Sequence, residues 1–358
     1  MNPAVLGIGE SVPEHSIRQK EAEVLAHDLC CKTPEEKERL STIYKRSRVD
    51  RRGSVLLNGS NGDSPRQCFF DQKTPAPTTK ERMDRYIREA TPLALAAVQK
   101  ALEASRLRPS DISQLITVSC TGFAAPGIDI GIIKKAGFSP RVGRTHIGFM
   151  GCHAALNGLR VACAMARQHP ENPVLLCAVE LCSLHFYCGW DPEKVVANAL
   201  FADGSAAVAI GGTAAGRTAW RVAANGSCLF PDSEEMMAWT IGDHGFEMNL
   251  SIRVPEMISL HLRGWLEGWL EETGLSIDAV RSWAIHPGGP RILSSVGTAL
   301  QIQPRELSVS EEVLASHGNM SSPTILFILK RLQEKKAPLP CVALAFGPGL
   351  AAEAALFV

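Results

Sequence analysis

The chain has 358 residues, of which 45% are hydrophobic, so it can bury one large core or two fused halves. Its 37 basic residues balance 37 acidic ones, so net charge provides no general attraction to nucleic acid or membranes. No segment reaches the roughly 18 uninterrupted apolar residues of a membrane span, and the N-terminus does not resemble a signal peptide. The eleven cysteines form no paired C-x-x-C motifs and no evident disulfide framework. We therefore expect a soluble, reduced, cytoplasmic protein without a metal.

Polar residues with Asn-Gly and Pro-rich pairs from 54 to 79 predict a surface loop or insertion. A helix is predicted to begin at Pro92, with Thr91 as its cap, because helix-favouring and apolar side chains follow. Further helices are predicted over 256–273 and from Pro323 onward. Short apolar runs predict strands that are buried on both faces. They span 114–121, 173–181, 205–211, 282–286, 341–346 and 354–358.

Strands and helices alternate along the chain, which predicts an α/β protein. A softer, glycine-containing seam lies at 211–216. It would divide the chain into two unequal α/β halves, 1–212 and 213–358.

Cys152 stands where the glycine-containing segment 148–151 gives way to a helix predicted to run to about residue 168. Small and aliphatic side chains on nearly every face predict that this helix is buried. Free N–H groups and the helix dipole at its start favour a thiolate and could donate to a carbonyl oxygen bonded to the sulfur. Cys152 is therefore a candidate nucleophile, although a buried cysteine is more often inert.

Two later segments could supply partners for that sulfur. His286 precedes Pro-Gly-Gly-Pro, and Asn319 lies within His-Gly-Asn-Met-Ser-Ser-Pro. A Cys/His/Asn set serves acyl transfer. His286 could instead be a loop histidine and Asn319 a turn residue. A papain-like protease uses the same residue types in this order, but its Cys-Gly-Ser/Ala-Cys-Trp/Tyr signature is missing.

Several motifs together resemble the type III polyketide synthases, the chalcone-synthase-like family, of the bacterial type. The motifs span 120–129, 148–157, 198–205, 286–290, 318–322 and 346–350. The similarity covers roughly 114–358 and is weaker before it. It implies a thiolase-like αβαβα fold of five layers, made of two duplicated halves, and a homodimer. It also implies repeated decarboxylative condensation of malonyl-CoA onto an acyl-CoA starter, without a metal or redox cofactor.

The resemblance assigns the family's catalytic Cys, His and Asn to Cys152, His286 and Asn319. Cys152 would take the starter acyl group from CoA. His286 would pair with the thiolate and then, with Asn319, donate hydrogen bonds to the thioester oxygen of malonyl-CoA. Each such donor to the enolate left by carbon dioxide is often worth about 3 to 4 kcal/mol. The enolate would attack the Cys152 thioester, and the lengthened chain would return to CoA.

The substrate cavity is also assigned by resemblance. Phe201 corresponds to the gatekeeping Phe between the CoA tunnel and the cavity, although core packing alone could explain it. Met248 stands where the family has a second gatekeeping Phe, and an unbranched Met can move aside. The remaining assigned cavity residues are Cys120, Cys182 and His185, which replace threonines of plant chalcone synthases, and Gly347 and Pro348 of the loop after Ala345.

CoA phosphates need cations, and the basic residues between 45 and 52 form a local cluster in a neutral chain. Arg39 and Arg46 correspond to the family's basic residues at the tunnel mouth, and Arg291 is a further candidate. A solvated helix face would explain the cluster equally well.

Two other functions compete with iterative polyketide synthesis. A single-round ketoacyl synthase of fatty-acid initiation shares the fold and the catalytic residue types, but the Gly-Pro-Gly near the C-terminus favours the polyketide branch. A noncatalytic acyl-CoA-binding relative would not need all three catalytic residues.

The starter can be predicted from cavity bulk. Met248 in place of a Phe, with Ala124, Ala125 and Ala197 nearby, indicates less bulk around the cavity. This predicts a preference for medium or long aliphatic acyl-CoA over p-coumaroyl-CoA, with alkylpyrones or alkylresorcinols as products. A malonyl-primed naphthalene product is the rival, because Cys120 resembles a Cys of bacterial enzymes of that kind. Trp239 or His185 could refill the space.

Overall fold

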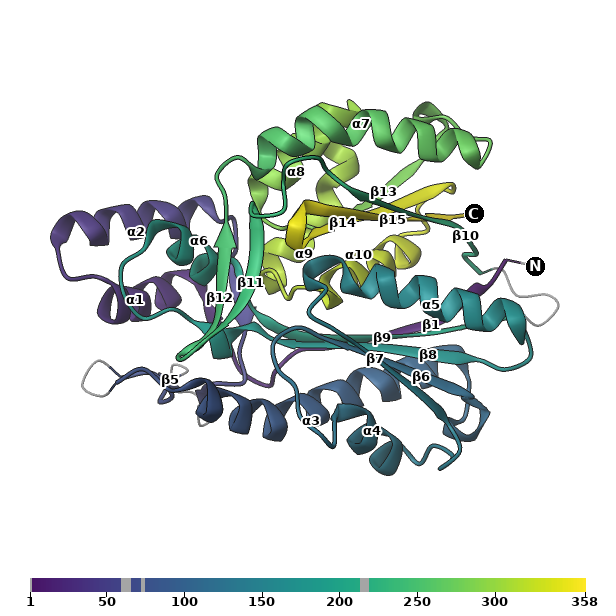
Figure 1. Cartoon of the computed structure of the whole chain (residues 1–358), viewed down its shortest axis with the longest axis horizontal. Coiled ribbons are helices and arrows are strands. Elements are labelled where there is room, and N and C mark those ends of the chain that lie inside the picture. The colour runs from purple at the N-terminus through teal and green to yellow at the C-terminus, as the bar shows by residue number, and fades with distance from the viewer. Residues whose placement is uncertain (1, 59–65, 72–74, 213–218) are drawn as a thin grey trace.

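The computed structural model describes residues 2–58, 66–71, 75–212 and 219–358. Two mixed sheets form its centre (Figure 1), with strand orders β1-β9-β8-β6-β7 and β10-β15-β14-β13. Three short two-stranded sheets pair β11 with β12, β2 with β3, and β4 with β5. The strands are β1 Ala4–Ser11, β2 Ser16–Arg18, β3 Arg51–Gly53, β4 Leu57–Asn58, β5 Arg66–Gln67, β6 Gln114–Ser119, β7 Gly143–Gly148, β8 Val174–Leu181, β9 Asp203–Gly211, β10 Val222–Leu229, β11 Met237–Gly242, β12 Gly245–Leu250, β13 Ser282–Ile285, β14 Cys341–Gly347 and β15 Ala351–Phe357.

Helices separate and cover the two large sheets in five layers (Figure 1). α3 and α4 cover the outer face of the first sheet, α5 and α10 lie between the sheets, and α7 and α8 cover the second. α1, α2 and α6 pack together at one side of this stack. The helices are α1 Gln19–Cys30, α2 Pro34–Arg46, α3 Thr79–Ser105, α4 Ile128–Ala136, α5 Ala154–Gln168, α6 Pro192–Leu200, α7 Val254–Glu272, α8 Pro290–Leu300, α9 Ser308–His317 and α10 Pro323–Glu334.

The strands predicted from short apolar runs are confirmed as β6, β8, β9, β13, β14 and β15. Every residue of β8, β9 and β14 is buried, as expected for strands with helices on both faces. Strands that are buried on both faces do not alternate between apolar and polar residues. A continuous apolar run was therefore the only signal by which the sequence could predict them.

The prediction that a helix begins at Pro92 is wrong, because α3 begins at Thr79 and carries Pro92 in its interior. Thr78 forms the start: its side chain accepts a hydrogen bond from the Glu81 backbone, and the Glu81 side chain accepts one from the Thr78 N–H. A proline removes one helical hydrogen bond. The buried face of α3, which packs on the first sheet, offsets that loss.

The polar stretch expected as a loop over 54–79 contains the short strands β4 and β5 and the first residue of α3, while 59–65 and 72–74 lie outside the described residues. The predicted boundary between 212 and 213 adjoins 213–218, which also lie outside them. Within the described part of the chain, no helix is long and apolar enough to cross a membrane.

Candidate active site

Cys152 lies in a turn of 3-10 helix, Gly151–His153, that leads from β7 into α5. Gly151 has a φ of 69°, a left-handed conformation that glycine adopts without strain, and a Cβ there would overlap the Pro348 ring. The backbone turns sharply here and presents Cys152 at the start of the buried helix. The predicted helix start at Cys152 is therefore confirmed to within two residues.

His286 and Asn319 reach the same place from the second half of the chain. His286 follows the end of β13, where its N–H donates to the Leu344 carbonyl at 2.8 Å. Asn319 lies in the turn between α9 and α10. Its N–H donates to the Leu200 carbonyl at 2.8 Å, and its carbonyl accepts from the Ala202 N–H at 2.9 Å, so it pairs with the residues that flank Phe201. A small recess of about 30 Å³ is lined by Cys152, Phe201, Met248, His286 and Asn319, among others.

Three polar atoms in this recess have no hydrogen-bond partner, although they are buried. They are both ring nitrogens of His286 and Nδ2 of Asn319. Oδ1 of Asn319 accepts from the Ser321 N–H at 2.8 Å, which orients the amide nitrogen and also makes the turn expected for this residue. Buried polar groups are almost always paired. These unpaired atoms therefore mark the recess as a place where a ligand would supply the missing partners.

Burial holds both the sulfur and the imidazole of this recess in their neutral forms. It raises the pKa of Cys152 to about 11, with Ser321 and Asn319 opposing the rise. It also lowers the pKa of His286 to about 3, with a smaller contribution from the nearby His153. This desolvation opposes the thiolate that the helix start was expected to favour. Ionising Cys152 requires a simultaneous proton acceptor, and His286 is available for that role.

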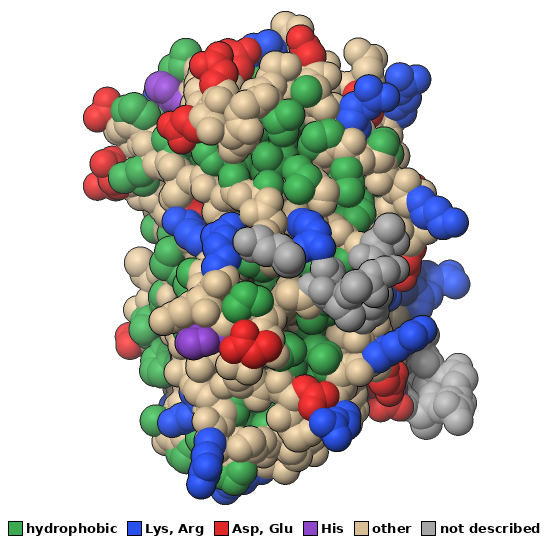
Figure 2. Space-filling model, turned by 90° about the vertical axis from the view of Figure 1, so that its right-hand side faces the viewer, with side chains coloured by type: hydrophobic (Ala, Val, Ile, Leu, Met, Phe, Trp, Pro, Cys, Tyr) green, Lys and Arg blue, Asp and Glu red, His purple; other side chains and the backbone are tan. Residues whose placement is uncertain are grey.

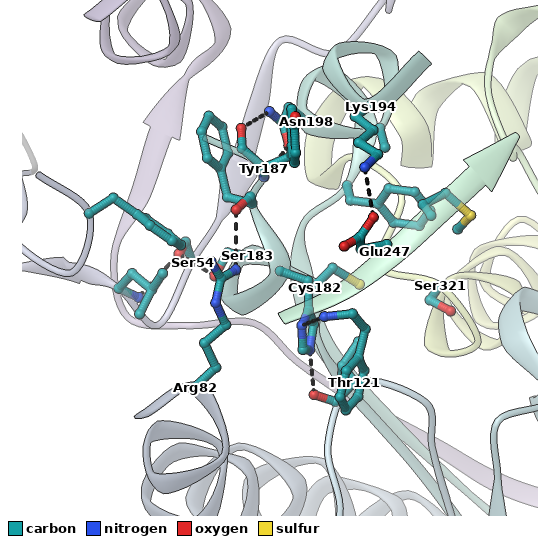
Figure 3. A pocket seen from close by; sticks show the side chains of 18 of the residues that line it. Ser54, Arg82, Thr121, Cys182, Ser183, Tyr187, Lys194, Asn198, Glu247 and Ser321 are labelled. Carbon is teal, nitrogen blue, oxygen red and sulfur yellow. Dashed lines mark hydrogen bonds and ion pairs between the residues drawn. The ribbon is translucent and has the colours of Figure 1, made fainter. Parts of the chain in front are cut away.

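A larger cavity of about 420 Å³ meets the recess at Cys152, Phe201, Met237 and Met248, which line both. Figure 3 shows part of this cavity, with Ser321 and Cys182 on one side and Ser54 and Arg82 on the other. Part of the cavity lining is apolar and comes from β2, α1 and the segments after β3 and β5. These side chains are Ile17, Ala22, Leu25, Leu29, Leu56, Leu57 and Phe70.

The structure places most of the predicted cavity residues on this cavity. Phe201, Met248, Cys120, Cys182, His185 and Pro348 line it. Gly347 does not; it packs directly behind, where a Cβ would overlap the ring of His153. Of the alanines expected to enlarge the cavity, Ala197 lines it, whereas Ala124 and Ala125 do not, and Ala125 is exposed. The expectation of extra space beside those two alanines is therefore wrong.

An aromatic wall, which we define as His185, Trp239 and Phe246, occupies the side of the cavity nearest β12. The His185 and Phe246 rings stack with centroids 4.2 Å apart, and Trp239 meets both edge-on. His185 Nε2 donates to the Thr121 carbonyl at 2.7 Å, and the Phe246 N–H donates to Nδ1 at 2.8 Å. Burial lowers the pKa of His185 to about 3, so this ring acts as a neutral, fully bonded wall. Trp239 and His185 thus occupy cavity space, which was the alternative left open to the expectation of a less bulky cavity.

The cations that line the cavity are not the ones predicted to meet the CoA phosphates, and those CoA contacts stay a prediction. Arg39 and Arg46 on α2 and Arg291 on α8 are exposed and do not line it. Arg52, Arg82 and Lys194 do. Of these three, only Arg52 belongs to the basic cluster that was recognised in the sequence. Arg82 and Lys194 lie in other segments, which come together only in the folded chain.

These lining cations are already bonded to the protein. Arg52 Nη1 donates to the carbonyls of Asn198 and Phe201, at 3.0 Å for the latter. Lys194 forms an ion pair with Glu247 on β12 at 2.7 Å (Figure 3). The α6 segment that carries Phe201 is thus held from both sides.

Glu180 is a buried carboxyl beside the cavity that sequence reasoning missed. It accepts hydrogen bonds from the backbone of Cys120 and Thr121 and from the hydroxyls of Thr121 and Ser322. Burial nevertheless raises its pKa to about 7. A signal was available, because Glu180 is the only charged residue in the apolar run of β8, and a buried charge is costly unless it is bonded.

Among the described residues, no group of three or more His, Cys, Asp or Glu side chains is placed to hold a metal ion. A model of the N-terminal domain of chalcone and stilbene synthases matches residues 2–214, and one of the C-terminal domain matches 222–358. The chain belongs to the chalcone and stilbene synthase family. It is a type III polyketide synthase, a CoA-dependent acyltransferase, which excludes the papain-like alternative.

Curated relatives of this polyketide synthase include two bacterial proteins. The α-pyrone synthesis polyketide synthase-like Pks18 of Mycobacterium tuberculosis is 32% identical, with 98% of this chain and 90% of the relative covered. The 1,3,6,8-tetrahydroxynaphthalene synthase of Streptomyces peucetius is 33% identical, with 98% and 91% covered.

Solved structures agree with the five-layered arrangement. PKS-I of the brown alga Ectocarpus siliculosus superposes with a TM-score of 0.94 at 29% identity, covering 99% of this chain and 98% of that one. The tetrahydroxynaphthalene synthase of Streptomyces coelicolor gives 0.88 at 29% identity, with the same coverage. The predicted thiolase-like fold is thereby confirmed.

Proposed function

We propose that this type III polyketide synthase loads a medium- to long-chain aliphatic acyl group onto Cys152, extends it with malonyl-CoA, and releases an alkylpyrone or alkylresorcinol. The observation that carries this proposal is the cavity of about 420 Å³, which is lined by Cys152 and by the apolar side chains of Leu25, Leu29 and Phe70. Each starter methylene buried against such side chains could contribute about 0.8 kcal/mol to binding.

In the loading step, His286 accepts the Cys152 proton as the sulfur attacks the carbonyl carbon of the acyl-CoA thioester. The new C–S bond to Cys152 replaces the C–S bond to CoA, and the proton leaves with CoA. This coupling removes the need for a free thiolate, which the pKa of about 11 for Cys152 disfavours.

Neutral His286 and Asn319 then donate hydrogen bonds to the thioester oxygen of malonyl-CoA. Loss of carbon dioxide breaks a C–C bond, and its electron pair forms an enolate. The enolate oxygen accepts hydrogen bonds from the donors of His286 and Asn319, which have no partner in the protein. The enolate carbon attacks the Cys152 thioester, a C–C bond forms, the C–S bond to Cys152 breaks, and the released sulfur takes up one proton from solvent to restore the thiol. The lengthened chain on CoA can then reload for another extension before it cyclises.

Malonyl-primed synthesis of a naphthalene is the second candidate. Two observations favour it: Cys120 lines the cavity beside Cys152, and a relative with 33% identity is a tetrahydroxynaphthalene synthase. No external starter would be needed in that case.

The deciding experiment offers malonyl-CoA alone or with octanoyl-CoA, lauroyl-CoA or p-coumaroyl-CoA, followed by mass spectrometry of the products. We expect the aliphatic starters to dominate. Equal product without any added starter would favour the naphthalene reading. Met248→Phe should shift preference toward shorter chains, whereas Met248→Leu, of similar volume, should not. An unchanged preference in Met248→Phe would remove Met248 as its cause.

We also propose that the protein is a homodimer. The edge strand β7 exposes alternate residues, and the large apolar side chains of Phe123, Phe149 and Met150 lie exposed close to its end. Light scattering coupled to size exclusion would test this, because a monomeric mass at micromolar concentration contradicts it.

A further inference from the structure

A chain of hydrogen bonds ends on the wall of the larger cavity, outside the Cys152 recess. Ser54 follows β3, Ser183 lies in the turn after β8, and Asp203 is the first residue of β9. The hydroxyl oxygens of Ser54 and Ser183 are 2.7 Å apart, and that of Ser183 is 2.6 Å from Oδ2 of Asp203. Ser54 and Ser183 line the cavity and are labelled in Figure 3, whereas Asp203 is fully buried behind them.

The direction of these hydrogen bonds follows from the carboxylate. Asp203 also accepts the N–H groups of Ser183 at 2.7 Å and Val55 at 2.8 Å, so both of its oxygens are engaged as acceptors. Burial raises its pKa to about 6, so it is ionised at neutral pH and cannot donate. Ser183 must therefore donate to Asp203, and Ser54 must donate to Ser183.

The hydroxyls of Ser54 and Ser183 each already donate their hydrogen within the protein, but their oxygens can still accept hydrogen bonds. Each hydroxyl oxygen has two lone pairs. Ser183 accepts from Ser54, and Ser54 accepts from the Leu56 N–H at 3.1 Å, so one lone pair is left on each oxygen. The two residues are partly exposed and lie on the cavity wall, so these lone pairs can be reached by a ligand in the cavity.

The surroundings make this acceptor pair selective. The neighbouring cavity residues Leu56, Leu57 and Phe70 are apolar, so an unsubstituted alkyl chain lying against the serines would cover their lone pairs without offering them a hydrogen-bond donor. A chain with a hydroxyl group at that point would donate to them. Sites built to bond a hydroxyl discriminate strongly against the analogue that lacks it.

We propose that Ser54 and Ser183 select a starter acyl chain that carries a hydroxyl group, with Asp203 holding both serines as acceptors. The proposal rests on the aliphatic starter proposed above and refines its chemical class. Ser183 directly follows Cys182, and both residues line the same cavity as Cys152, so we place the hydroxyl toward the thioester end of the chain. Ser54 and Ser183 are specificity residues in this scheme, and Asp203 is a positioning residue.

The test compares decanoyl-CoA with its 3-hydroxy, 5-hydroxy and 10-hydroxy derivatives at matched malonyl-CoA, using kcat/KM for product formation. We expect a gain of at least about ten-fold for the 3-hydroxy or 5-hydroxy starter over decanoyl-CoA, which corresponds to about 1.4 kcal/mol. The 10-hydroxy starter should show no gain.

Two variants assign the gain to the serines. Ser183→Ala should abolish it, measured as the ratio of kcat/KM for the hydroxylated starter to kcat/KM for decanoyl-CoA in the same variant. Ser183→Ala also removes one hydrogen-bond donor to the buried Asp203, which costs stability. Ser54→Ala is therefore the second variant. It keeps the bond between Ser183 and Asp203 and should reduce the gain by about half on a logarithmic scale. Ser259→Ala, an exposed serine on α7, is the matched control and should behave as wild type.

Each outcome bears on the proposal. A gain that is absent in the wild type, or that persists in both variants, overturns it. Turnover of decanoyl-CoA without any hydroxyl preference would overturn this inference alone and leave the aliphatic starter standing. Turnover of neither decanoyl-CoA nor its derivatives would overturn the aliphatic starter and this inference together.

Discussion

The Cys152 recess and the aromatic wall belong to two neighbouring spaces that share lining residues, but their polar atoms are hydrogen-bonded in opposite ways. In the recess, both nitrogens of His286 and the amide nitrogen of Asn319 lack partners. In the wall, both nitrogens of His185 and the indole N–H of Trp239 are bonded to the protein. His185 and Phe246 of the wall are buried, as are His286 and Asn319 of the recess, so burial alone does not distinguish the two regions. Unpaired polar atoms indicate where substrate chemistry takes place, and paired ones indicate where shape is maintained.

The largest effect is expected from Cys152→Ala, which removes the proposed nucleophile at the centre of the recess. Covalent loading should disappear and product formation should fall by roughly 10⁴-fold or more. Alanine fits the helix start, so the fold should be retained. Intact-protein mass spectrometry would measure loading, with Cys182→Ala as a control that keeps a cysteine-lined cavity. A hydroxylamine-sensitive acyl adduct on the Cys152→Ala protein would show that another residue is the nucleophile.

The two unpaired donors should be separable by their effects on loading and decarboxylation. His286→Ala and Asn319→Ala should each lower malonyl-CoA decarboxylation by about 10² to 10³-fold, because each removes one donor to the enolate oxygen. Asn319→Ala should retain more starter loading, since His286 can still accept the Cys152 proton. Carbon dioxide release and intact mass report the two steps. Equal loading defects in both variants would contradict this division of roles.

Burial of His286 without a partner should also appear in the pH dependence of stability. The unfolded chain takes up a proton at a histidine pKa near 6.5, whereas folded His286 stays neutral until its pKa of about 3. The unfolded state therefore binds more protons as pH falls, and this residue should cost about 2 kcal/mol of unfolding free energy between pH 6.5 and pH 5. Urea unfolding of His286→Ala should show a correspondingly smaller loss.

The control for that experiment is His169→Ala, which alters an exposed histidine. It should lose stability on acidification as the wild type does. If His286→Ala and the wild type lose the same amount between pH 6.5 and pH 5, then His286 is not held neutral by burial.

The smallest effect is expected in the wall. Trp239→Phe keeps an aromatic ring but removes the N–H that donates to the Cys120 carbonyl at 2.7 Å. The free energy of unfolding should fall by about 1 kcal/mol. Malonyl-CoA decarboxylation should stay near the wild-type rate, because no donor to substrate is lost. A decarboxylation defect comparable to that of Asn319→Ala would erase the contrast between the wall and the recess.

Much of the recess could be predicted from local sequence. The glycine-containing turn into an apolar helix marked Cys152, and the motifs around His286 and Asn319 supplied its two partners. Each of these motifs is a short backbone arrangement with its own composition, which is why it is readable in one segment. The helix start at Pro92 was wrong for the opposite reason: packing of α3 on the first sheet overrides a local proline.

The sequence alone determined the α/β class and the family and marked Cys152, His286 and Asn319, because these depend on short motifs and on continuous apolar runs. Only the tertiary structure decided which alanines line the cavity, that Arg39, Arg46 and Arg291 do not line it, and that burial opposes a thiolate at Cys152. It also decided that Ser54, Ser183 and Asp203 meet. Those outcomes depend on distances and desolvation between segments far apart in the chain, and no single segment carries that information.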